Sequence, residues 1–226
     1  LIQRTVQGIQ ISWQEMVAPI VMTFNDILHK FRSESFTEHD KGTQFERLMR
    51  LWLLSDPRYS NLTDVWLWED FPSRGDLGGR DTGIDLVARA DNGEYWAIQC
   101  KCYKEDAVID KPAVDSFLAT SSRQFLDVDT LQTTSFAHRL WISTTNHWGN
   151  NAEEAIKNQN PPLNRVGLVD LQTSPVDWKL LLDGLQGKDA MLPGKKPREH
   201  QLRAMSAAAE YFATNDRGKL IMACGT

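Results

Sequence analysis

Three polar residues in the middle of the chain have the types and spacing of a hydrolytic metal site. Asp85 closes the segment Gly83-Ile84-Asp85, and Gln99 and Lys101 follow on the next strand-like segment, with fourteen positions from the Asp to the Gln. A carboxylate, an amide oxygen and a main-chain carbonyl are the oxygen ligands that Mg²⁺ prefers. A lysine beside such an ion can orient an attacking water and help to deprotonate it. The chemistry expected of this set is metal-assisted hydrolysis of a phosphate ester.

Whether these side chains meet depends on the register of a hairpin. The segments on either side of Asp91-Asn92-Gly93 both read as strands, and this tripeptide is a strong turn signal. A three-residue loop places Asp85 opposite Gln99, and then all three polar side chains lie on one face of the sheet. A two-residue loop would place Asp85 opposite Cys100 and divide the site. We predict the three-residue loop, or a bulge with the same effect.

The apolar neighbours of the three residues indicate that they lie in a core. The flanking positions include Ile84, Leu86, Ala97 and Ile98. An unpaired Asp, Gln or Lys in such surroundings is costly or changes to its neutral form, and a bound divalent metal would compensate. The alternative is that Asp85 is a turn residue and Lys101 a solvated charge at a sheet edge. The spacing alone does not decide between the two.

The rest of the chain predicts a mixed sheet flanked by helices. Helices are expected at 13–32 and 38–54, and the second has an apolar stripe with Glu46 just beside it. A strand at 65–68 and a glycine-rich loop at 71–83 precede the hairpin. Further elements alternate downstream: a helix near 112–123, a strand at 139–144, a helix near 150–159, a strand at 166–171, and a helix opened by Ser174-Pro175. This order is typical of an α/β fold.

Composition argues against a general DNA-binding surface. The 226 residues carry a formal charge of −5 and the sequence pI is about 5.6, whereas contact with phosphates needs clustered Lys and Arg. Any grip on DNA must therefore be local, or come from other parts of a longer protein. Three cysteines cannot build a disulfide framework, and no stretch reaches the ~18 apolar residues of a membrane span. We expect a cytoplasmic location.

Three blocks of sequence resemble a known nuclease family. Residues 79–86 (GRDTGIDL) and 95–101 (YWAIQCK) look like the nuclease core of the Mrr-like branch of the PD-(D/E)xK endonucleases. That branch typically has Gln where the standard motif has Glu. Residues 41–48 (KGTQFERL) resemble the first core helix of the family, whose Glu reaches the metal directly or through water.

This resemblance implies a role for each polar residue of the site. Asp85, Gln99 and Lys101 match the catalytic positions, and Glu46 matches the accessory acid. The metal would be Mg²⁺, with Mn²⁺ as a substitute, and its ligands would be Asp85, Gln99, the backbone carbonyl of Cys100 and Glu46. Asp81 is a candidate second acid or, alternatively, only a cap of the tight turn that follows it. Gln in place of Glu removes one negative charge, so metal binding should be weaker and Glu46 more important.

The order of the blocks is similar to that of a narrower group. With 54–57 (LSDP) and 65–68 (VWLW) between them, they resemble the N-terminal nuclease of single-chain Type ISP restriction-modification enzymes, over roughly residues 22–226. The resemblance implies a restriction-endonuclease-like core that cuts double-stranded DNA and leaves 5′-phosphate ends. The implied partners are helicase and methyltransferase or target-recognition regions of the same polypeptide. Two alternatives stay open: the nuclease of a Type I or Type III system or another nuclease-helicase, and a catalytically silent binding module with the same fold.

The end of the chain resembles the start of a superfamily-two helicase. In residues 197–204 (PREHQLRA), Gln201 stands where such motors usually recognise adenine. Residues 222–226 (MACGT) resemble a Walker A loop cut off before its Gly-Lys-Thr, so Gly225 and Thr226 would be incomplete ATP-binding positions. We expect no ATP hydrolysis by this chain, although ATP would drive the full motor. Gln201 could instead be only a polar residue on a helix.

Four parts are expected along the chain. They are an N-terminal extension at 1–21, the nuclease domain at 22–185, a linker at 186–196 and the truncated start of a RecA-like motor domain at 197–226.

DNA contacts are predicted at four further positions. Ser143 and Thr144 end a strand and could contact the DNA backbone or only cap the strand. Lys104 and Arg80 flank the site in sequence and could contact phosphates or belong to the solvated surface.

Overall fold

The computed structural model describes residues 22–35, 37–78, 83–184, 187–192, 198–215 and 217. The predictions for 1–21, Arg80, Asp81, Gly225 and Thr226 therefore lie outside the described residues. The chain divides into two units, Leu1–Leu192 and Pro193–Thr226. The candidate site around Asp85 belongs to the first unit, and the described part of the second unit holds α7 (Glu199–Phe212).

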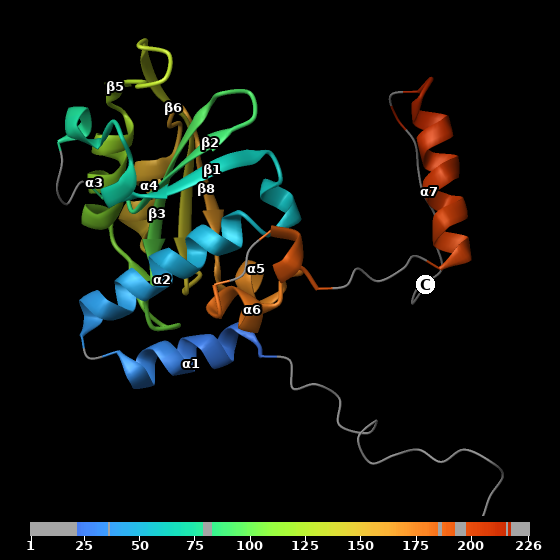
Figure 1. Ribbon diagram of the computed structural model, residues 1–226, viewed down its shortest axis with the longest axis horizontal. Coiled ribbons are helices and arrows are strands. Elements are labelled where there is room, and N and C mark those ends of the chain that lie inside the picture. Colours follow the sequence, from blue (N-terminus) through green and yellow to red (C-terminus); the bar gives the residue numbers. More distant parts are fainter. Residues whose placement is uncertain are drawn as a thin grey trace, which may run out of the picture. The chain divides into compact units, whose positions relative to one another are not determined.

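A mixed sheet forms the centre of the first unit (Figure 1). Its strands run in the order β1 (Leu62–Leu67), β2 (Leu86–Ala90), β3 (Tyr95–Lys101), β6 (Thr133–Ser143) and β5 (Gln124–Leu126), and β8 (Leu163–Val166) also pairs with β6. The pairs β1/β2, β2/β3 and β5/β6 are antiparallel, whereas β3/β6 and β6/β8 are parallel. A separate parallel pair joins β4 (Val108–Ile109) to β7 (His147–Trp148). The predicted mixed α/β fold is confirmed.

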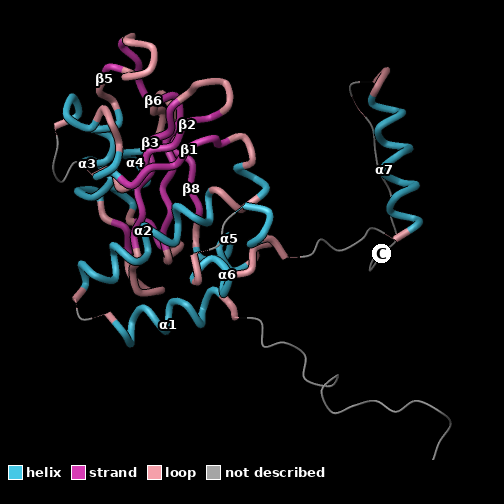
Figure 2. Tube along the Cα trace, in the orientation of Figure 1, coloured by secondary structure: helices cyan, strands magenta, loops and turns pink. Residues whose placement is uncertain are grey.

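Helices cover both faces of this sheet (Figure 2). On one face lie α1 (Phe24–Glu34), α2 (Glu38–Leu53), α5 (Leu168–Gln172) and α6 (Trp178–Leu182), and on the other lie α3 (Lys111–Ser121) and α4 (Asn150–Ile156). The pleat of β3 divides the two cores, because Ile98 and Cys100 pack in the first and Tyr95 and Ala97 in the second. The strand that ends in Lys101 is therefore buried on both faces along most of its length.

Side-chain caps fix where the first two helices begin. The helix predicted at 13–32 is described from Phe24, where Thr23 and Asp26 form a capping box. The helix predicted at 38–54 is α2, and its N-cap Thr37 accepts a hydrogen bond from Asp40 N at 3.0 Å. The predicted apolar stripe of α2 is buried, and it consists of Phe45, Leu48, Met49 and Trp52. Glu46 thus lies at the edge of the face of α2 that packs against the sheet.

The strand predicted at 166–171 is wrong, because β8 ends at Val166 and α5 follows at once. Side-chain acceptors explain the early helix. Gly167 N donates to Asp170 Oδ2 at 2.8 Å, and Leu168 N donates to Asn146 Oδ1 at 3.1 Å. These bonds satisfy main-chain N–H groups that the first turn of a helix leaves without partners. The apolar run at 166–171, which predicted a strand, carries no information on these bonds.

The helix α6 also begins later than the sequence indicates. The helix predicted to open at Ser174-Pro175 is α6, and Asp177 is its N-cap. Residues 187–192, which were predicted as part of the linker, include the 3₁₀ turn η5 (Gly187–Ala190) and pack on this edge. Asp177 N donates to Ala190 O at 2.7 Å, and Ala190 is fully buried.

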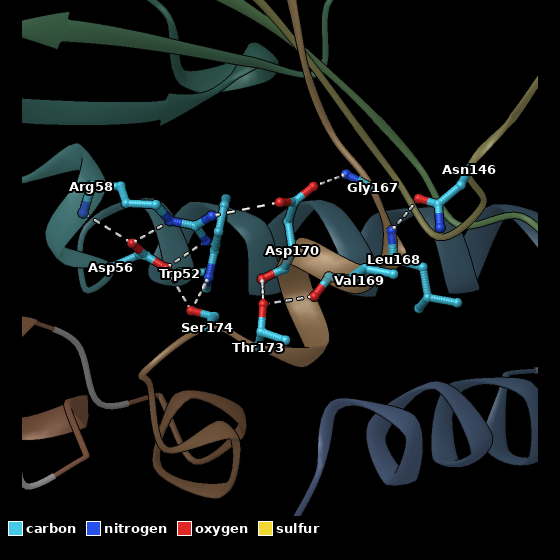
Figure 3. Close-up of polar contacts among 10 residues, drawn as sticks. All are labelled: Trp52, Asp56, Arg58, Asn146, Gly167, Leu168, Val169, Asp170, Thr173 and Ser174. Atoms are coloured by element: carbon cyan, nitrogen blue, oxygen red, sulfur yellow. Dashed lines mark hydrogen bonds and ion pairs between the residues drawn. The ribbon is translucent and has the colours of Figure 1, made fainter. Parts of the chain in front are cut away.

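A polar network fixes the C-terminal end of α2 near α5 (Figure 3). Trp52 Nε1 donates to Ser174 Oγ at 2.8 Å, and Ser174 Oγ donates to Asp56 Oδ2 at 2.5 Å. Arg58 donates to the same carboxylate through Nε at 2.9 Å and Nη2 at 2.8 Å. Burial raises the pKa of Asp56, but hydrogen bonds from Arg58 and Ser174 outweigh it and hold that pKa below its ordinary value. The helix that carries Glu46 is thereby anchored.

Candidate active site

The hairpin between β2 and β3 has the predicted three-residue loop. Gly93 N donates to Ala90 O at 2.9 Å, and Ala90 N donates to Glu94 O at 2.9 Å. The pairing of the two strands keeps this register along the hairpin. Asp85 therefore lies opposite Gln99, which is the register that keeps the polar side chains together.

The carboxylate of Asp85 receives two hydrogen bonds from β3. Cys100 N donates to Asp85 Oδ2 at 2.8 Å, and the side-chain nitrogen of Gln99 donates to the same oxygen. On its other side, the main-chain carbonyl of Asp85 accepts from Trp68 N at 2.8 Å. Gln99 is only 1% exposed. The predicted convergence of Asp85 and Gln99 is present in the structure, and both residues are held by the surrounding main chain.

A pocket of about 340 Å³ brings Asp85 together with Lys101 and Glu46. Its walls come from α2, from the end of β1 with the 3₁₀ turn η3 (Trp68–Asp70), and from the hairpin. The lining residues are His39, Thr43, Glu46, Arg47, Leu67, Trp68, Glu69, Gly83, Ile84, Asp85 and Lys101. Gln99 does not line this pocket and reaches it through its contact with Asp85.

Burial and the neighbouring acids raise the proton affinity of Glu46. Burial raises the pKa of Glu46 to about 7, and the negative charge of Asp85 adds to the shift. Glu69 acts in the same direction, whereas Lys101 and Arg47 oppose it. Carboxylates that share a partly desolvated pocket repel one another, and a cation between them would favour their ionised forms. The electrostatics of the pocket thus suit a bound cation.

Four pocket residues with charged, imidazole or hydroxyl side chains were not predicted from the sequence: His39, Thr43, Arg47 and Glu69. Glu69 lies in η3, where the bond from Trp68 N to the Asp85 carbonyl holds this turn beside the start of β2. The antiparallel pairing of β1 with β2 is the signal that could have found it, because it places the end of one strand next to the start of the other. His39 and Thr43 could have been found from helical spacing, since they lie seven and three positions before Glu46 on the same side of α2.

Gly83 allows the segment that leads into Asp85 to lie close against α3. Its φ of 76° is in the left-handed region, and a Cβ at this position would lie 2.9 Å from both Phe117 N and Ser116 Oγ of α3. Only glycine therefore fits between the loop and the helix. Gly93 in the hairpin loop also has a positive φ, of 83°, but no atom lies within 4 Å of its added Cβ.

The predicted DNA contacts at Ser143 and Thr144 need correction. The two residues are 2% and 0% exposed. Ser143 Oγ donates to Thr145 O at 2.8 Å, and Thr144 Oγ1 donates to Tyr103 O at 2.6 Å. Enclosed hydroxyls that already donate to carbonyl groups cannot reach a phosphate, so these residues have the capping role that the sequence left as the alternative. Lys104, in contrast, is exposed just beyond β3.

Gln201 belongs to α7 in the second unit. Its Oε1 accepts a hydrogen bond from Arg198 N at 2.8 Å, which satisfies a donor at the start of the helix. Recognition of adenine by this residue stays a prediction. Within the part of the chain that the structure describes, every helix falls short of the length and apolarity that a membrane crossing requires.

The donor set at the pocket fits a hard divalent cation. Among the described residues, no group of three or more His, Cys, Asp or Glu side chains has the arrangement of a metal site. The oxygen donors are of mixed type: the carboxylates of Asp85 and Glu46 line the pocket, and the Gln99 amide contacts Asp85. A half-turn of the Gln99 amide would exchange its nitrogen for its oxygen beside Asp85. Oxygen donors of these kinds match the preference of Mg²⁺.

Comparison with known proteins gives one matching family and several similar solved structures. The restriction endonuclease family Mrr_cat_2 matches residues 54–187. Among solved structures, the ATP-dependent Type ISP restriction-modification enzyme LlaBIII bound to DNA is similar, with 29% identity and a TM-score of 0.61. The match covers 89% of this chain and 12% of that enzyme, so the chain spans about an eighth of the length of LlaBIII.

Two other restriction endonucleases show weaker likeness. The MspJI restriction endonuclease in complex with a 27-mer oligonucleotide has 16% identity and a TM-score of 0.41, over 88% of this chain and 43% of that one. The DNA modification-dependent restriction endonuclease AspBHI has 14% identity and a TM-score of 0.38, over 81% and 41%. No curated protein sequence matches the chain.

Proposed function

Because this chain belongs to the restriction endonuclease family Mrr_cat_2 and is thus a DNA nuclease domain, we propose that it hydrolyses phosphodiester bonds of double-stranded DNA at the pocket lined by Glu46, Asp85 and Lys101. One observation carries this proposal. The carboxylates of Glu46 and Asp85 and the amine of Lys101 come from separate elements and share one cavity, with Gln99 bonded to Asp85.

The metal proposed for this pocket is Mg²⁺, for which Mn²⁺ could substitute. Asp85, Glu46, the Gln99 amide oxygen and the Cys100 carbonyl would hold it, and Glu69 or Asp81 could add a further acid. When bound, such an ion supplies stabilisation of the negative charge that builds up on the phosphate and lowers the pKa of water. Oxygen ligands suit Mg²⁺, which is usually bound through one or two carboxylates and keeps several waters.

The protein's own groups would position the substrate and the attacking water. Lys101 lines the pocket beside Asp85 and can orient the water, help to remove its proton and donate a hydrogen bond to the phosphate. The water oxygen bonds to phosphorus, its proton passes to the surrounding solvent with the help of Lys101, and the bond from phosphorus to the 3′ oxygen breaks. The 3′ oxygen takes up a proton, so the products carry a 5′-phosphate and a 3′-hydroxyl.

The wider protein is proposed to be an ATP-driven restriction-modification enzyme of the Type ISP kind. The likeness to LlaBIII supports this reading, with helicase and methyltransferase or target-recognition regions as partners on the same polypeptide. Gln201, Gly225 and Thr226 would then belong to the ATP-binding motor. A cytoplasmic location suits the free thiols of Cys100 and Cys102.

Metal-dependent nicking of plasmid DNA tests the proposed activity. The chain, incubated with supercoiled plasmid and Mg²⁺, should produce nicked or linear DNA at a slow rate, since an acidic protein gains little affinity from counterion release. Mn²⁺ should support the reaction, EDTA should stop it, and ligation should require no added kinase because the ends carry 5′-phosphates. Cleavage that continues unchanged in EDTA would contradict a metal-dependent mechanism.

Replacement of Gly83 should impair cleavage more than replacement of Gly93. Gly83→Ala forces the loop away from α3 and displaces Asp85, and a shift of this kind can lower a rate by roughly 10- to 100-fold. Gly93→Ala, the matched control, meets no neighbouring atom and adds only backbone strain at the remote end of the hairpin. Initial rates of plasmid cleavage check this, and they are measured under conditions in which urea unfolding shows each variant to be folded. Equal losses at the two positions would argue against a positioning role for Gly83.

A further inference from the structure

A second pocket lies on an adjacent side of α2 from the candidate active site. It has a volume of about 380 Å³. The active-site pocket uses His39, Thr43 and Glu46 of this helix, whereas the second pocket uses Thr37, Glu38 and Lys41. The same relation holds at the end of β3, where its last residue, Lys101, lines the first pocket and Lys104, three residues further on, lines the second. The two cavities are therefore neighbours along the same two elements.

Positive charge is concentrated at the second pocket. Arg32 from α1, Lys41 from α2 and Lys104 from the segment after β3 all line it, against the single carboxylate of Glu38. Burial raises the pKa of the nearby Cys102 thiol, and the charges of Lys41 and Arg32 both oppose that shift. The three cations thus form a local basic site in a chain whose formal charge is −5.

Lys41 is unusual among these cations because it is enclosed. It is 8% exposed, and its ammonium pairs with Glu38, whose side chain is 90% exposed. An ion pair with so exposed a partner is weak, and a stronger anion entering the pocket could replace Glu38 at little cost. Arg32 and Lys104 are exposed and can meet that anion from the pocket's rim.

Hydrogen bonds hold the segment that carries Lys104 in place. Tyr103 O accepts from Thr144 Oγ1 at 2.6 Å and from Arg32 Nη2 at 3.3 Å. Thr145 Oγ1 is 2.9 Å from Glu105 O and 2.7 Å from Ala107 O. The basic site therefore rests on a fixed main chain. Glu105 and Asp106 are exposed on this segment but do not line the pocket.

We propose that the pocket lined by Arg32, Lys41 and Lys104 binds a backbone phosphate of the DNA, close to the phosphate that is cut at the neighbouring site. This inference rests on the proposed nuclease function. The planar guanidinium of Arg32 matches a phosphate group, and Lys41 and Lys104 supply point charges. The chain can thereby hold DNA locally despite its acidic net charge, and the scissile phosphate is placed in register with Asp85 and Lys101.

The salt dependence of DNA binding tests this proposal independently of cleavage. Affinity for a labelled duplex is measured by fluorescence anisotropy in EDTA, over NaCl from about 25 to 200 mM. The double variant Arg32→Gln/Lys104→Gln should bind roughly 10- to 50-fold more weakly and reduce the slope of log Kd against log [NaCl] by about 2. Glu38→Gln should bind more tightly than the unmodified chain, because it frees Lys41 and removes a negative charge.

Lys157→Gln/Lys179→Gln is the matched control, with the same change in net charge at exposed positions, one at the C-cap of α4 and one in α6. It should leave the slope nearly unchanged. Equal losses in the two double variants would overturn the proposal while leaving metal-dependent cleavage intact. If the Arg32/Lys104 variant loses affinity as expected but the unmodified chain never cuts DNA, the phosphate pocket stands and the catalytic assignment fails.

Discussion

Asp85→Asn should abolish metal-dependent DNA cleavage, with a rate at least ~10³-fold below that of the unmodified chain. The substitution keeps the size of the side chain but removes the negative charge. In the structure this carboxylate is the meeting point of Gln99, Cys100 N and the pocket that holds Glu46.

Lys101→Met should lower the rate of cleavage while leaving metal affinity nearly unchanged, because the amine acts on water and phosphate rather than on the ion.

Asp91→Asn, at the exposed turn of the same hairpin, is the control for Asp85→Asn and makes the same change of charge. It should cut plasmid within about twofold of the unmodified rate, as expected of a surface substitution. If Asp85→Asn and Asp91→Asn behave alike, the catalytic assignment is wrong.

Glu46→Gln should have opposite effects on activity and on stability. It removes a proposed metal ligand, so cleavage at low Mg²⁺ should fall by roughly 10- to 100-fold. It also removes the repulsion from Asp85 that helps to raise the pKa of Glu46 to about 7. At pH 8 the metal-free variant should therefore be more stable than the unmodified chain, by roughly 1–2 kcal/mol once partial exposure is allowed for.

The sign of this effect follows from the raised pKa. The folded state holds the Glu46 proton more tightly than the unfolded state, whose pKa is near the ordinary 4.5. The stability that this proton contributes is complete below pH 4.5 and is lost as the pH rises through 7. Urea unfolding in EDTA at several pH values measures it, with Glu154→Gln on the exposed side of α4 as the control. A stability difference between Glu46→Gln and the unmodified chain that does not grow between pH 5 and 8 would refute the assignment.

The core of the site could be predicted because its geometry is local. The tripeptide Asp91-Asn92-Gly93 determines the loop length, the loop length sets the register, and the register places Asp85 opposite Gln99. Glu46 could be placed on the correct side of α2 because the buried stripe of that helix fixes its rotation. Both inferences need only the periodicity of one or two neighbouring elements.

The rest of the site depends on contacts between distant segments, which periodicity does not specify. Glu69 enters the pocket because β1 pairs with β2, and Arg32 and Lys104 meet only through the packing of α1 against the end of β3. Ser143 and Thr144 look like a polar strand end in the sequence, yet Ser143 donates to Thr145 O in the turn that follows and Thr144 donates to Tyr103 O of a neighbouring segment. A hydroxyl's partner is set by tertiary packing, and the sequence around it carries little information on that point.

The most direct test of the central claim is the anomalous scattering of Mn²⁺ in crystals of the chain. One peak should lie in the pocket between Asp85 and Glu46, about 2.1–2.4 Å from a carboxylate oxygen of Asp85. The Gln99 amide should have turned so that its oxygen faces the ion, in place of the nitrogen that donates to Asp85 in the metal-free chain. Saturating Mn²⁺ that leaves this pocket empty, with the Gln99 nitrogen still bonded to Asp85, would contradict the account.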